Sequence, residues 1–513
     1  MEKRSFVAIA LSMAVLLAWS FLLPKSQTPV PQSVVTNQTS SLSAPLVSSA
    51  PIQAPAAPVQ APELLEESSF EFSTEKLNIT FIEPLAAIQE IEFLGKRNHV
   101  FPLKAGFWLG DKSLRFQKTE VTSNAVTFVH LDQNKKISKR FIFSNTNYGM
   151  DLELNVQSMS NLPLRLNLPL ILGVPNFASK SLDTRYLDLA VSTVDKMQHV
   201  NARKTLDFNN LKFLALRDQY FCAIVEPEFE NNTAYVRKID NTESEVGINL
   251  QEIELKPKQK VDLRFHIYLG PQDLKEIGFI NKTWGAIINF GTFDIISQIL
   301  LQVLDLLYKV FHNWGVAIIA LSVLVYFLLY PLTLKQMRSM KAMQAVQPKV
   351  EEIRRLYKDN PQRLNKEIMA LYKEHKVNPL GGCLPMLLQM PIFFALYQAL
   401  IRSVALRGAN FLWIKDLSEP DRLFTLPFSI PILGNEVNIL PLIMTLGMFV
   451  QQKFSMQTSS SASSSAEQQK IMMIAMPLMF GFIFYKMPSG LVLYWFVNSM
   501  LMLVYQIRIS RSK

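Results

Sequence analysis

The stretch KQMRSMKAMQAVQPKVEEIRRLYKDNPQRLNKEIMALYKEHKVNPLGGC, residues 335–383, is a charged insert between two long apolar runs. Apolar positions recur at helical spacing on both sides of the DNP sequence at 359–361, at Met343, Val346, Val350, Ile353 and Tyr357 and then at Leu364, Ile368 and Leu371. This spacing predicts two amphipathic helices that pair antiparallel, with Asn360 as the N-cap and Pro361 as the first residue of the second helix. We therefore expect a helical hairpin displayed on one face of a membrane.

On either side of this insert, the chain contains apolar runs long enough to cross a bilayer. About 20 apolar residues in a helix span the hydrocarbon core. The runs occupy residues 6–23, 314–330, 386–406, 439–453, 471–487 and 490–507. Hydrophobic residues make up 49% of the 513-residue chain, and the long stretch between the first run and the second lacks such a run. The pattern predicts a polytopic α-helical membrane protein with six transmembrane helices and one large aqueous insert.

The formal net charge of +10 comes from Lys and Arg that cluster beside the ends of the apolar runs. The positive-inside rule assigns such residues to the cytoplasmic side. It places residues 335–383, residues 454–470 and both chain termini in the cytoplasm, and residues 407–437 outside. We interpret the charge first as a topology signal and second as a contact for ribosomal RNA, and we expect no DNA partner.

The N-terminal part of the chain reads as an anchor followed by a linker. Residues 1–24 combine Lys3 and Arg4 with an apolar stretch that lacks a small-residue cleavage site, which predicts an uncleaved signal anchor. Residues 25–68 are rich in Pro, Ser, Thr, Gln and Ala and carry too little apolar surface to offset ordering, which predicts a flexible periplasmic linker.

In residues 69–280, apolar residues recur with a period of two. Apolar residues alternate with polar ones at Leu77, Ile79 and Phe81, at Met150, Leu152, Leu154 and Val156, at Leu164, Leu166, Leu168 and Leu170, and at Val261, Leu263, Phe265, Ile267 and Leu269. Alternation of this kind predicts half-buried antiparallel strands. We therefore expect one inserted all-β sandwich domain on the periplasmic side.

Metal, cofactor and disulfide chemistry find little support in the sequence. His99, His130, His199 and His266 lack the paired spacing of a metal site, so we expect no metal and no cofactor. The predicted topology places Cys222 and Cys383 on opposite sides of the membrane, which excludes a disulfide between them.

Residues 281–312 have an amphipathic pattern. Apolar positions at helical spacing are Phe293, Ile296, Leu300, Val303, Leu307 and Val310, and a polar stripe contains Asp294, Gln298, Asp305 and Lys309. Because Trp284 lies at the start and an apolar run follows, we expect an interfacial helix at the outer membrane surface. The alternative is a core helix of the β domain.

Basic residues cover the outer faces of the predicted hairpin. They are Arg354, Arg355, Lys358, Arg363 and Lys366. A solvated surface and an RNA-contacting surface explain them equally well.

Polar side chains recur inside the predicted spans. They are Ser322, Tyr326 and Tyr330 at four-residue intervals, Gln389 in the next span, and Tyr494 and Asn498 in the last, with Tyr505 on the same face. Intramembrane polar groups normally face protein or water, so the set predicts a polar groove within the membrane. The alternative for each residue is a hydrogen bond that holds two helices together.

Methionines form a second pattern in the same region. They are Met337, Met340, Met343, Met386, Met390, Met444, Met448, Met472, Met473, Met476 and Met479. Thioethers adapt to varied apolar partners, which suits a slot for many transmembrane sequences. Lipid-facing filler is the alternative.

Six motifs then make the pattern specific. Their order is YPLT (330–333), QPK (347–349), NPLGGCLP (378–385), QMPIFFALY (389–397), QQKIM (468–472) and PSGLVLYW (488–495). Together they closely resemble the YidC family of membrane protein insertases, from residue 284 to the C-terminus. The anchor and the β insert are similar to the layout of Gram-negative bacterial members. The predicted domains are therefore the anchor at 1–24, the linker at 25–68, the β domain at 69–280, the interfacial helix at 281–312 and the insertase core at 313–513.

The resemblance implies an inner-membrane insertase and chaperone rather than an enzyme. It implies activity alone on small proteins or beside the Sec translocon, often on ribosome-bound chains. The implied partners are nascent membrane proteins, the Sec translocon, the ribosome and the lipid bilayer. The implied fold of the periplasmic domain is a β-supersandwich similar to sugar mutarotases.

One position departs from the family that the chain resembles. Members usually carry an Arg four residues before the YPLT tyrosine to attract acidic substrate tails, whereas this chain has Tyr326. Arg402 is either a relocated charge or a residue that reaches the outer interface. We hypothesise that the groove works through hydration and hydroxyl groups, with residues 335–383 as a receiving platform at its cytoplasmic mouth.

Two other classes of protein compete with this interpretation. A channel or secondary transporter predicts internal repeats and buried acidic residues, but the five later apolar runs contain no Asp or Glu. A periplasmic carbohydrate-active enzyme predicts an acid–base pair in the β domain, and the sequence alone singles out none.

Overall fold

The computed structural model describes residues 68–95, 98–175, 186–200, 204–230, 232–240, 242–250, 252–290, 293–358, 360–375, 377, 384–430, 433–457 and 465–511. The expected anchor at 1–24 and all but the last residue of the expected linker at 25–68 lie outside the described residues. Cys383 and most of the NPLGGCLP motif also lie outside them.

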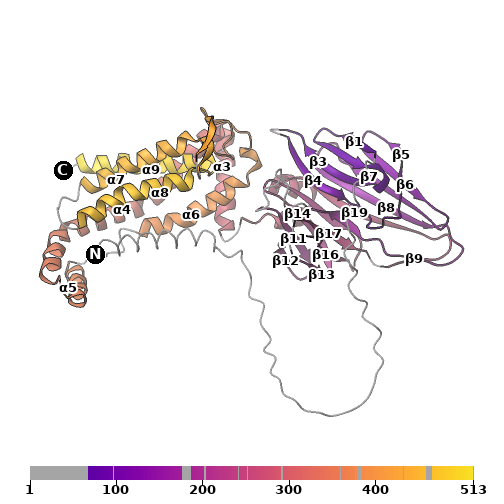
Figure 1. Cartoon of the computed structure of the whole chain (residues 1–513), viewed down its shortest axis with the longest axis horizontal. Coiled ribbons are helices and arrows are strands. Elements are labelled where there is room, and N and C mark those ends of the chain that lie inside the picture. Colours follow the sequence, from indigo (N-terminus) through magenta and orange to yellow (C-terminus); the bar gives the residue numbers. More distant parts are fainter. Residues whose placement is uncertain are drawn as a thin grey trace, which may run out of the picture. The chain divides into compact units, whose positions relative to one another are not determined.

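The first part of the described chain is a β domain built from antiparallel sheets (Figure 1). A nine-stranded sheet has the order β12-β11-β14-β15-β19-β8-β7-β6-β5. Its strands are β5 Gln117–Val121, β6 Ala125–Leu131, β7 Lys135–Phe143, β8 Gly149–Ser158, β11 Asp188–Thr193, β12 Met197–Val200, β14 Leu211–Arg217, β15 Phe221–Pro227 and β19 Lys260–Pro271.

Smaller sheets complete the domain. One four-stranded sheet has the order β1-β2-β3-β4 and another β10-β17-β16-β13, and β18 pairs with β9. Their strands are β1 Ser69–Ser73, β2 Leu77–Ile82, β3 Ala87–Phe93, β4 His99–Gly106, β9 Leu164–Leu166, β10 Leu170–Gly173, β13 Leu206–Phe208, β16 Thr233–Lys238, β17 Ser244–Asn249 and β18 Ile253–Leu255, with the short helix η1 Glu83–Leu85.

The core of the domain lies between sheets, as the alternating sequence predicts. On β8, residues alternate between half-buried and buried along the whole strand. The buried side chains Leu152 and Leu154 share one cluster with Phe81 and Ile91 from the first small sheet. Side chains from two sheets that interdigitate in this way define a β-sandwich, which confirms the predicted domain class.

Residues 274–290 close the β domain and correct the expected role of Trp284. They form α2 Leu274–Ile280 and the short helix η2 Lys282–Ile287. Trp284 is 1% exposed and packs with Ile287 and Phe290 against Phe213 and Cys222 of the sheet. The expectation that Trp284 marks the membrane interface is therefore wrong, because its indole is a core side chain of the β domain.

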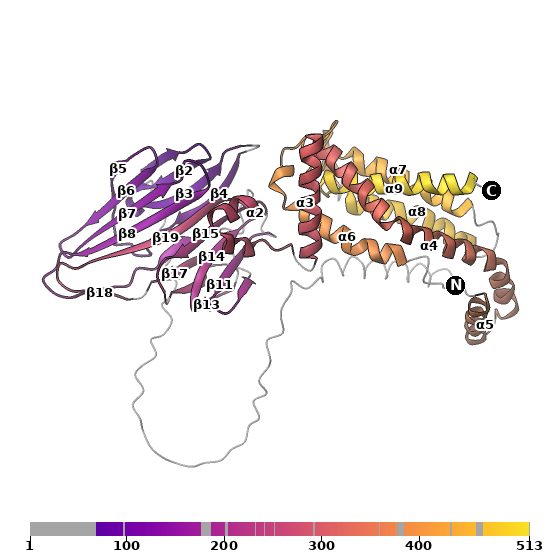
Figure 2. The same ribbon diagram turned by 180° about the vertical axis from the view of Figure 1, so that it is seen from behind.

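The amphipathic pattern that follows forms α3 Asp294–Phe311. Five of its six predicted apolar positions pack against the helical core, namely Phe293, Ile296, Leu300, Val303 and Leu307. The sixth, Val310, is 64% exposed and does not belong to that packed face. Figure 2 shows α3 running across the ends of the other helices rather than alongside them. On other sides of α3, large apolar residues such as Ile295 and Leu306 are exposed.

The next helix, α4 Trp314–Leu356, joins two expected elements into one. The sequence predicts a span that ends near residue 330 and a separate hairpin helix, but α4 continues through both Pro331 and Pro348. A proline ring removes one backbone hydrogen bond without ending a helix whose neighbours compensate. The hairpin arm is therefore a direct extension of a membrane-type helix.

The predicted hairpin itself is present. Helix α5 Pro361–Glu374 begins as expected, because the Asn360 side chain accepts a hydrogen bond from the Arg363 backbone at 3.1 Å. Val346 and Val350 of α4 pack against Leu371 of α5 and Val377. This seam confirms antiparallel pairing of the two arms.

The remaining helices are α6 Leu384–Ile401, α7 Ile439–Gln457, α8 Ser465–Phe484 and α9 Ser489–Arg511. A short helix, η4 Val404–Leu406, and a two-stranded hairpin of β20 Phe424–Ile430 and β21 Gly434–Val437 connect α6 to α7. Among the described residues, Trp314–Leu334 and Ser489–Arg508 are helical stretches long and apolar enough to cross a membrane, and Gln389–Ile401 and Ile474–Phe484 are shorter apolar helices. The count of six spans remains a prediction.

Candidate functional site

Five helices line a cavity of about 290 Å³ in the helical part of the chain. Its lining comes from α4, α6, α7, α8 and α9. The polar lining residues are Tyr326, Thr333, Gln389, Gln451, Gln452, Asn498 and Ser499, and thioethers come from Met390, Met448, Met476 and Met502. The cavity thus combines hydrogen-bonding groups with adaptable apolar surface.

No Asp, Glu, Lys or Arg is among the residues that line this cavity in the described part of the chain. Amide and hydroxyl groups both donate and accept hydrogen bonds, so they can solvate neutral polar groups of either kind. The outer surfaces of the same helices are apolar, for example at Phe327 and Leu446. Polar groups are therefore presented inward, in the arrangement that hydrocarbon surroundings require.

Three of the six predicted groove residues meet in the cavity. Tyr326, Gln389 and Asn498 line it together, although they come from three helices. Gln389 donates to the Tyr494 hydroxyl at 2.8 Å, and Asn498 donates to the Tyr494 carbonyl at 3.1 Å. Tyr494 is fully buried, so it supports the lining from behind.

Ser322 and Tyr330 do not line the cavity. Ser322 is fully buried, and its hydroxyl donates to the Ile318 carbonyl of its own helix at 2.8 Å. The Tyr330 ring packs edge-on against Tyr505, with ring centroids 5.5 Å apart. Ser322, Tyr326 and Tyr330 are spaced four residues apart on α4, but of these three only Tyr326 lines the cavity.

The sequence interpretation missed Thr333, Gln451, Gln452 and Ser499. Gln451 and Gln452 stand three and four residues after Met448, so helical spacing with a predicted slot methionine was the available signal. They were overlooked because they lie at the end of an apolar run, where polar residues are ordinary. Thr333 belongs to the YPLT motif.

The Tyr326 hydroxyl is a buried oxygen that has no hydrogen-bond partner among the described residues. An unpaired buried hydroxyl is destabilising by about 1–3 kcal/mol. Its ring lies 6.3 Å from that of Tyr330, between centroids. The hydroxyl therefore remains available to a group that enters the cavity.

Arg402 does not reach this cavity. It follows the last residue of α6 and donates to the Asn289 carbonyl at 3.2 Å, with its guanidinium 6.0 Å from the centre of the Tyr186 ring. Of the two roles weighed for Arg402, a relocated charge in the groove is thus excluded.

The five basic residues of the hairpin are exposed, as expected for an outer face. The last turn of α4 contains Arg354 and Arg355, and Lys358 follows the helix. Helix α5 carries Arg363 and Lys366. The Arg363 guanidinium lies 5.1 Å from the centre of the Tyr357 ring. The surface is positively charged and points away from the seam.

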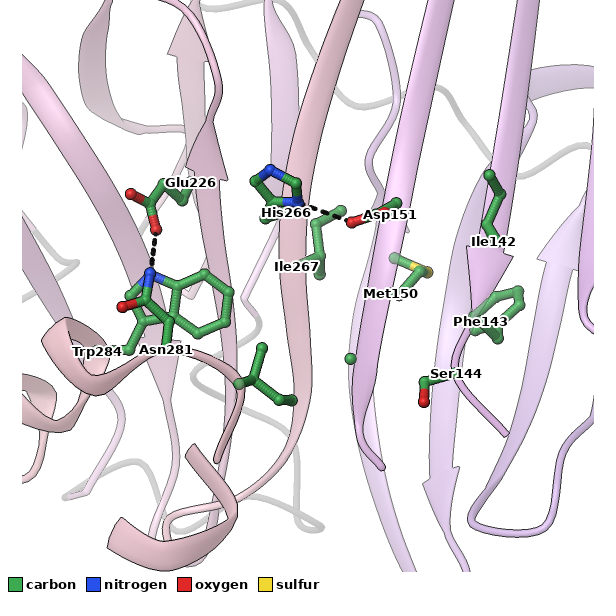
Figure 3. Close-up of a pocket in the computed structure, with 12 residues that line it drawn as sticks. Ile142, Phe143, Ser144, Met150, Asp151, Glu226, His266, Ile267, Asn281 and Trp284 are labelled. Atoms are coloured by element: carbon green, nitrogen blue, oxygen red, sulfur yellow. Dashed lines mark hydrogen bonds and ion pairs between the residues drawn. The ribbon is translucent and has the colours of Figure 1, made fainter. Parts of the chain in front are cut away.

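The β domain has a separate cavity of about 470 Å³ (Figure 3). There Glu226 accepts hydrogen bonds from the Trp284 indole at 2.5 Å and from Asn281 at 2.9 Å, while His266 bonds Asp151 at 2.8 Å. Among the described residues, Glu226 and His266 share no hydrogen bond, so the cavity holds two separate pairs rather than one coupled acid and base. The pairs fasten η2 to β15 and β8 to β19.

Two further histidines of the β domain have hydrogen-bond partners. His99 bonds Asp218 at 2.6 Å, and His130 bonds the Arg115 carbonyl at 2.8 Å. Among the described residues, no group of three or more metal-binding side chains lies together. Cys222 is buried in the sheet, and burial raises the pKa of its thiol.

Comparisons with known proteins match both parts of the chain. A family profile described as YidC periplasmic domain matches residues 78–303, and one described as 60Kd inner membrane protein matches residues 306–513. The membrane protein insertase YidC of Pelobacter propionicus is 31% identical over 552 residues, covering 100% of this chain and 99% of the relative. That of Syntrophobacter fumaroxidans is 35% identical, covering 73% and 68% of the two chains.

Among solved structures, a crystal structure of an active YidC insertase with the first transmembrane domain resolved is 20% identical in sequence. It covers 86% of this chain and 92% of its own, with a TM-score of 0.41.

Proposed function

Because the chain belongs to the YidC family of membrane protein insertases, we propose that the cavity between its helices receives the polar segments of proteins entering the bilayer. The observation that carries this proposal is the uncharged polar lining, formed by residues of five helices within an apolar exterior. A polar group without partners in hydrocarbon costs several kcal/mol. Amides and hydroxyls in the cavity lower that barrier while the apolar part of the substrate moves into lipid.

The position of the cavity along the helices supports a route from the hairpin end. Thr333 lies just before α4 extends into the hairpin arm, and Gln451 and Gln452 lie near the end of α7. The exposed basic residues of the hairpin lie in the last turn of α4, in the connection that follows it and on α5. We propose that the hairpin at 335–383 first receives nascent chains or ribosomes, and that the cavity lies next on the path.

The topology and the domain division also belong to this proposal. Six spans, cytoplasmic termini, a periplasmic β domain and an inner-membrane location follow from the charge pattern and from the family. The proposed division keeps the anchor, linker and insertase core, with the β domain extended to residue 290 because Trp284, Ile287 and Phe290 pack in its core. Cooperation with the Sec translocon and a chaperone role are proposed on the same basis, without an enzymatic step.

An insertion assay with glutamine variants tests the role of the cavity. We expect the double variant Gln451→Leu/Gln452→Leu to insert a single-span substrate with a neutral polar tail several-fold less efficiently, because each lost hydrogen bond contributes about 1 kcal/mol. Insertion of the same span with a minimal tail should be nearly unchanged. Full-length protein in proteoliposomes and protease protection of the tail provide the measurement.

Gln506→Leu is the matched control, since Gln506 is a glutamine of a membrane helix that does not line the cavity. It should insert both substrates at the native level. Equal loss in Gln506→Leu and in the double variant, or no loss in the double variant, contradicts the proposed role of the cavity.

A further inference from the structure

The connection between α6 and α7 exposes an unusual number of large apolar side chains. Leu412 and Trp413 precede the β20–β21 hairpin, and Leu423, Phe424 and Phe428 lie at its start and on β20. Leu412 is 76% exposed, Phe428 62% and Phe424 50%. Exposed apolar surface of this kind, gathered in one short connection, marks a contact with another apolar phase or partner.

The hairpin is short and has only one pair of strands. Phe424 pairs with Val437 and Thr425 with Glu436, and the register then shifts before Ile430 meets Gly434. An isolated two-stranded hairpin is marginally stable in water. Its apolar side chains therefore need surroundings that stabilise them, and the rest of the described chain leaves them exposed.

The base of the hairpin is nevertheless fixed firmly to the helices. The Asp421 carboxylate accepts hydrogen bonds from the backbone of Ile439 and Leu440, both at 2.9 Å, at the start of α7. Asn438 donates to the Tyr485 carbonyl at 2.7 Å, and the Tyr485 hydroxyl donates to the Glu436 carbonyl at 2.8 Å. The apolar residues thus project from a fixed mount.

Charged side chains lie at the base of the hairpin. The Arg422 guanidinium forms ion pairs with Glu419 at 2.9 Å and with Glu436 at 3.0 Å. The ion pairs of Arg422 therefore lie at the base of the hairpin beside the exposed Phe424, and Phe428 is exposed farther along β20. Paired charge next to exposed apolar side chains is expected of a segment at the boundary between headgroups and hydrocarbon.

The exposed apolar surface continues directly into the helices. Two residues after β21, α7 begins, and its first turns expose Leu442 and Leu446 on one face. Helix α3, which lies across the helix ends, also exposes Ile295 and Ile299. In Figure 1 the hairpin, drawn in orange, projects sideways from the end of the helices at which α7 begins.

We propose that the β20–β21 hairpin is a membrane-surface anchor whose partner is the lipid bilayer. Phe424 and Phe428 insert among the acyl chains just below the headgroups, while the ion pairs of Arg422 remain in the headgroup layer. This inference depends on the membrane location of the family and not on the role of the cavity. Together with α3, the hairpin fixes the depth of the helix ends in the bilayer.

Depth-dependent quenching of a tryptophan placed on the hairpin tests the proposal. Phe424→Trp is made in the full-length chain in liposomes that contain phosphatidylcholine brominated either near the headgroup or near the chain end. Its fluorescence is obtained as the difference from the native chain. We expect several-fold stronger quenching by the shallow bromines than by the deep ones, and little quenching by aqueous iodide.

Thr425→Trp is the matched control, because Thr425 is the exposed neighbour on the regular part of the strand and points to the opposite face. Its indole should be quenched by iodide and much less by bromolipid. Quenching of the Phe424→Trp indole by iodide alone overturns the proposal. Protection of that indole from both quenchers also overturns it, because a protein surface, such as a translocon subunit or a second copy, then covers the hairpin.

Discussion

At the scale of single residues, the cavity depends on which polar atoms are satisfied and which are left open. Gln389 of α6 and Asn498 of α9 both donate hydrogen bonds to Tyr494 of α9, which fixes this wall of the cavity. Tyr326 faces the same cavity with a hydroxyl that lacks a partner in the described chain. The first group maintains the shape of the cavity, and Tyr326 is available to an incoming segment.

Paired phenylalanine variants separate these two roles. Tyr326→Phe removes the unpartnered hydroxyl, so the thermal midpoint of the detergent-solubilised protein should stay the same or rise, while insertion of polar tails should fall. Tyr494→Phe removes the acceptor of Gln389 and should be destabilising by about 1 kcal/mol, because it leaves the amide unpaired. A lower midpoint for Tyr326→Phe than for Tyr494→Phe contradicts this assignment.

Single positions were predictable from the sequence to an uneven degree. Gln389 and Asn498 stood out because amides in apolar runs need partners. Ser322 has the same spacing as Tyr326, but its hydroxyl bonds its own helix, and a one-helix pattern cannot distinguish these outcomes. Trp284 was misassigned because an indole suits both a membrane interface and a β-domain core.

At the scale of elements, a buried lysine fastens the β domain together. Lys139 on β7 is fully buried, and its ammonium nitrogen lies 2.5 Å from the Ala86 carbonyl and also bonds the Phe107 carbonyl. Burial lowers the pKa of Lys139 well below its usual value. The unfolded chain therefore binds more protons than the folded one between that lowered pKa and 10.5.

This difference in bound protons makes the free energy of unfolding of the β domain depend on pH. Stability should rise with pH across that window, by up to about 1.4 kcal/mol per pH unit relative to Lys139→Met, which cannot titrate. Urea unfolding of the β domain within the full-length chain, followed by its strand signal between neutral and alkaline pH, measures the slope. Lys136, an exposed lysine of the same strand, provides the control, and Lys136→Met should keep the native slope. If the difference in free energy of unfolding between the native protein and Lys139→Met does not change with pH, the assignment is wrong.

Elements were predicted well where one physical rule dominates. Period-two alternation located β2, β8 and β19, and the Asn360 cap located the start of α5. The continuity of α4 was missed because Pro331 reads as a boundary in one sequence, while neighbouring helices determine whether it ends a helix. The β20–β21 hairpin was missed because its strands are short and contain Pro427.

At the scale of the whole molecule, the helical part contains the elements of the proposed insertion route. In the helical part, α3 runs across the ends of the other helices, and the basic α4–α5 hairpin extends from the C-terminal part of α4. The uncharged cavity is lined by residues of α4, α6, α7, α8 and α9. We propose that polar segments of a substrate enter this cavity.

Site-specific photocrosslinking distinguishes the cavity from the outer helix surface as the place where the substrate's polar tail is bound. A photoreactive phenylalanine analogue replaces Tyr326, which lines the cavity, or Phe327, which is the next residue and is 66% exposed on the outer surface of α4. Each full-length protein is irradiated while it engages a ribosome-stalled single-span membrane protein. We expect position 326 to crosslink the polar tail of the substrate and position 327 to crosslink lipid or the apolar span. An active protein that yields tail adducts from position 327 but none from position 326 would contradict the account.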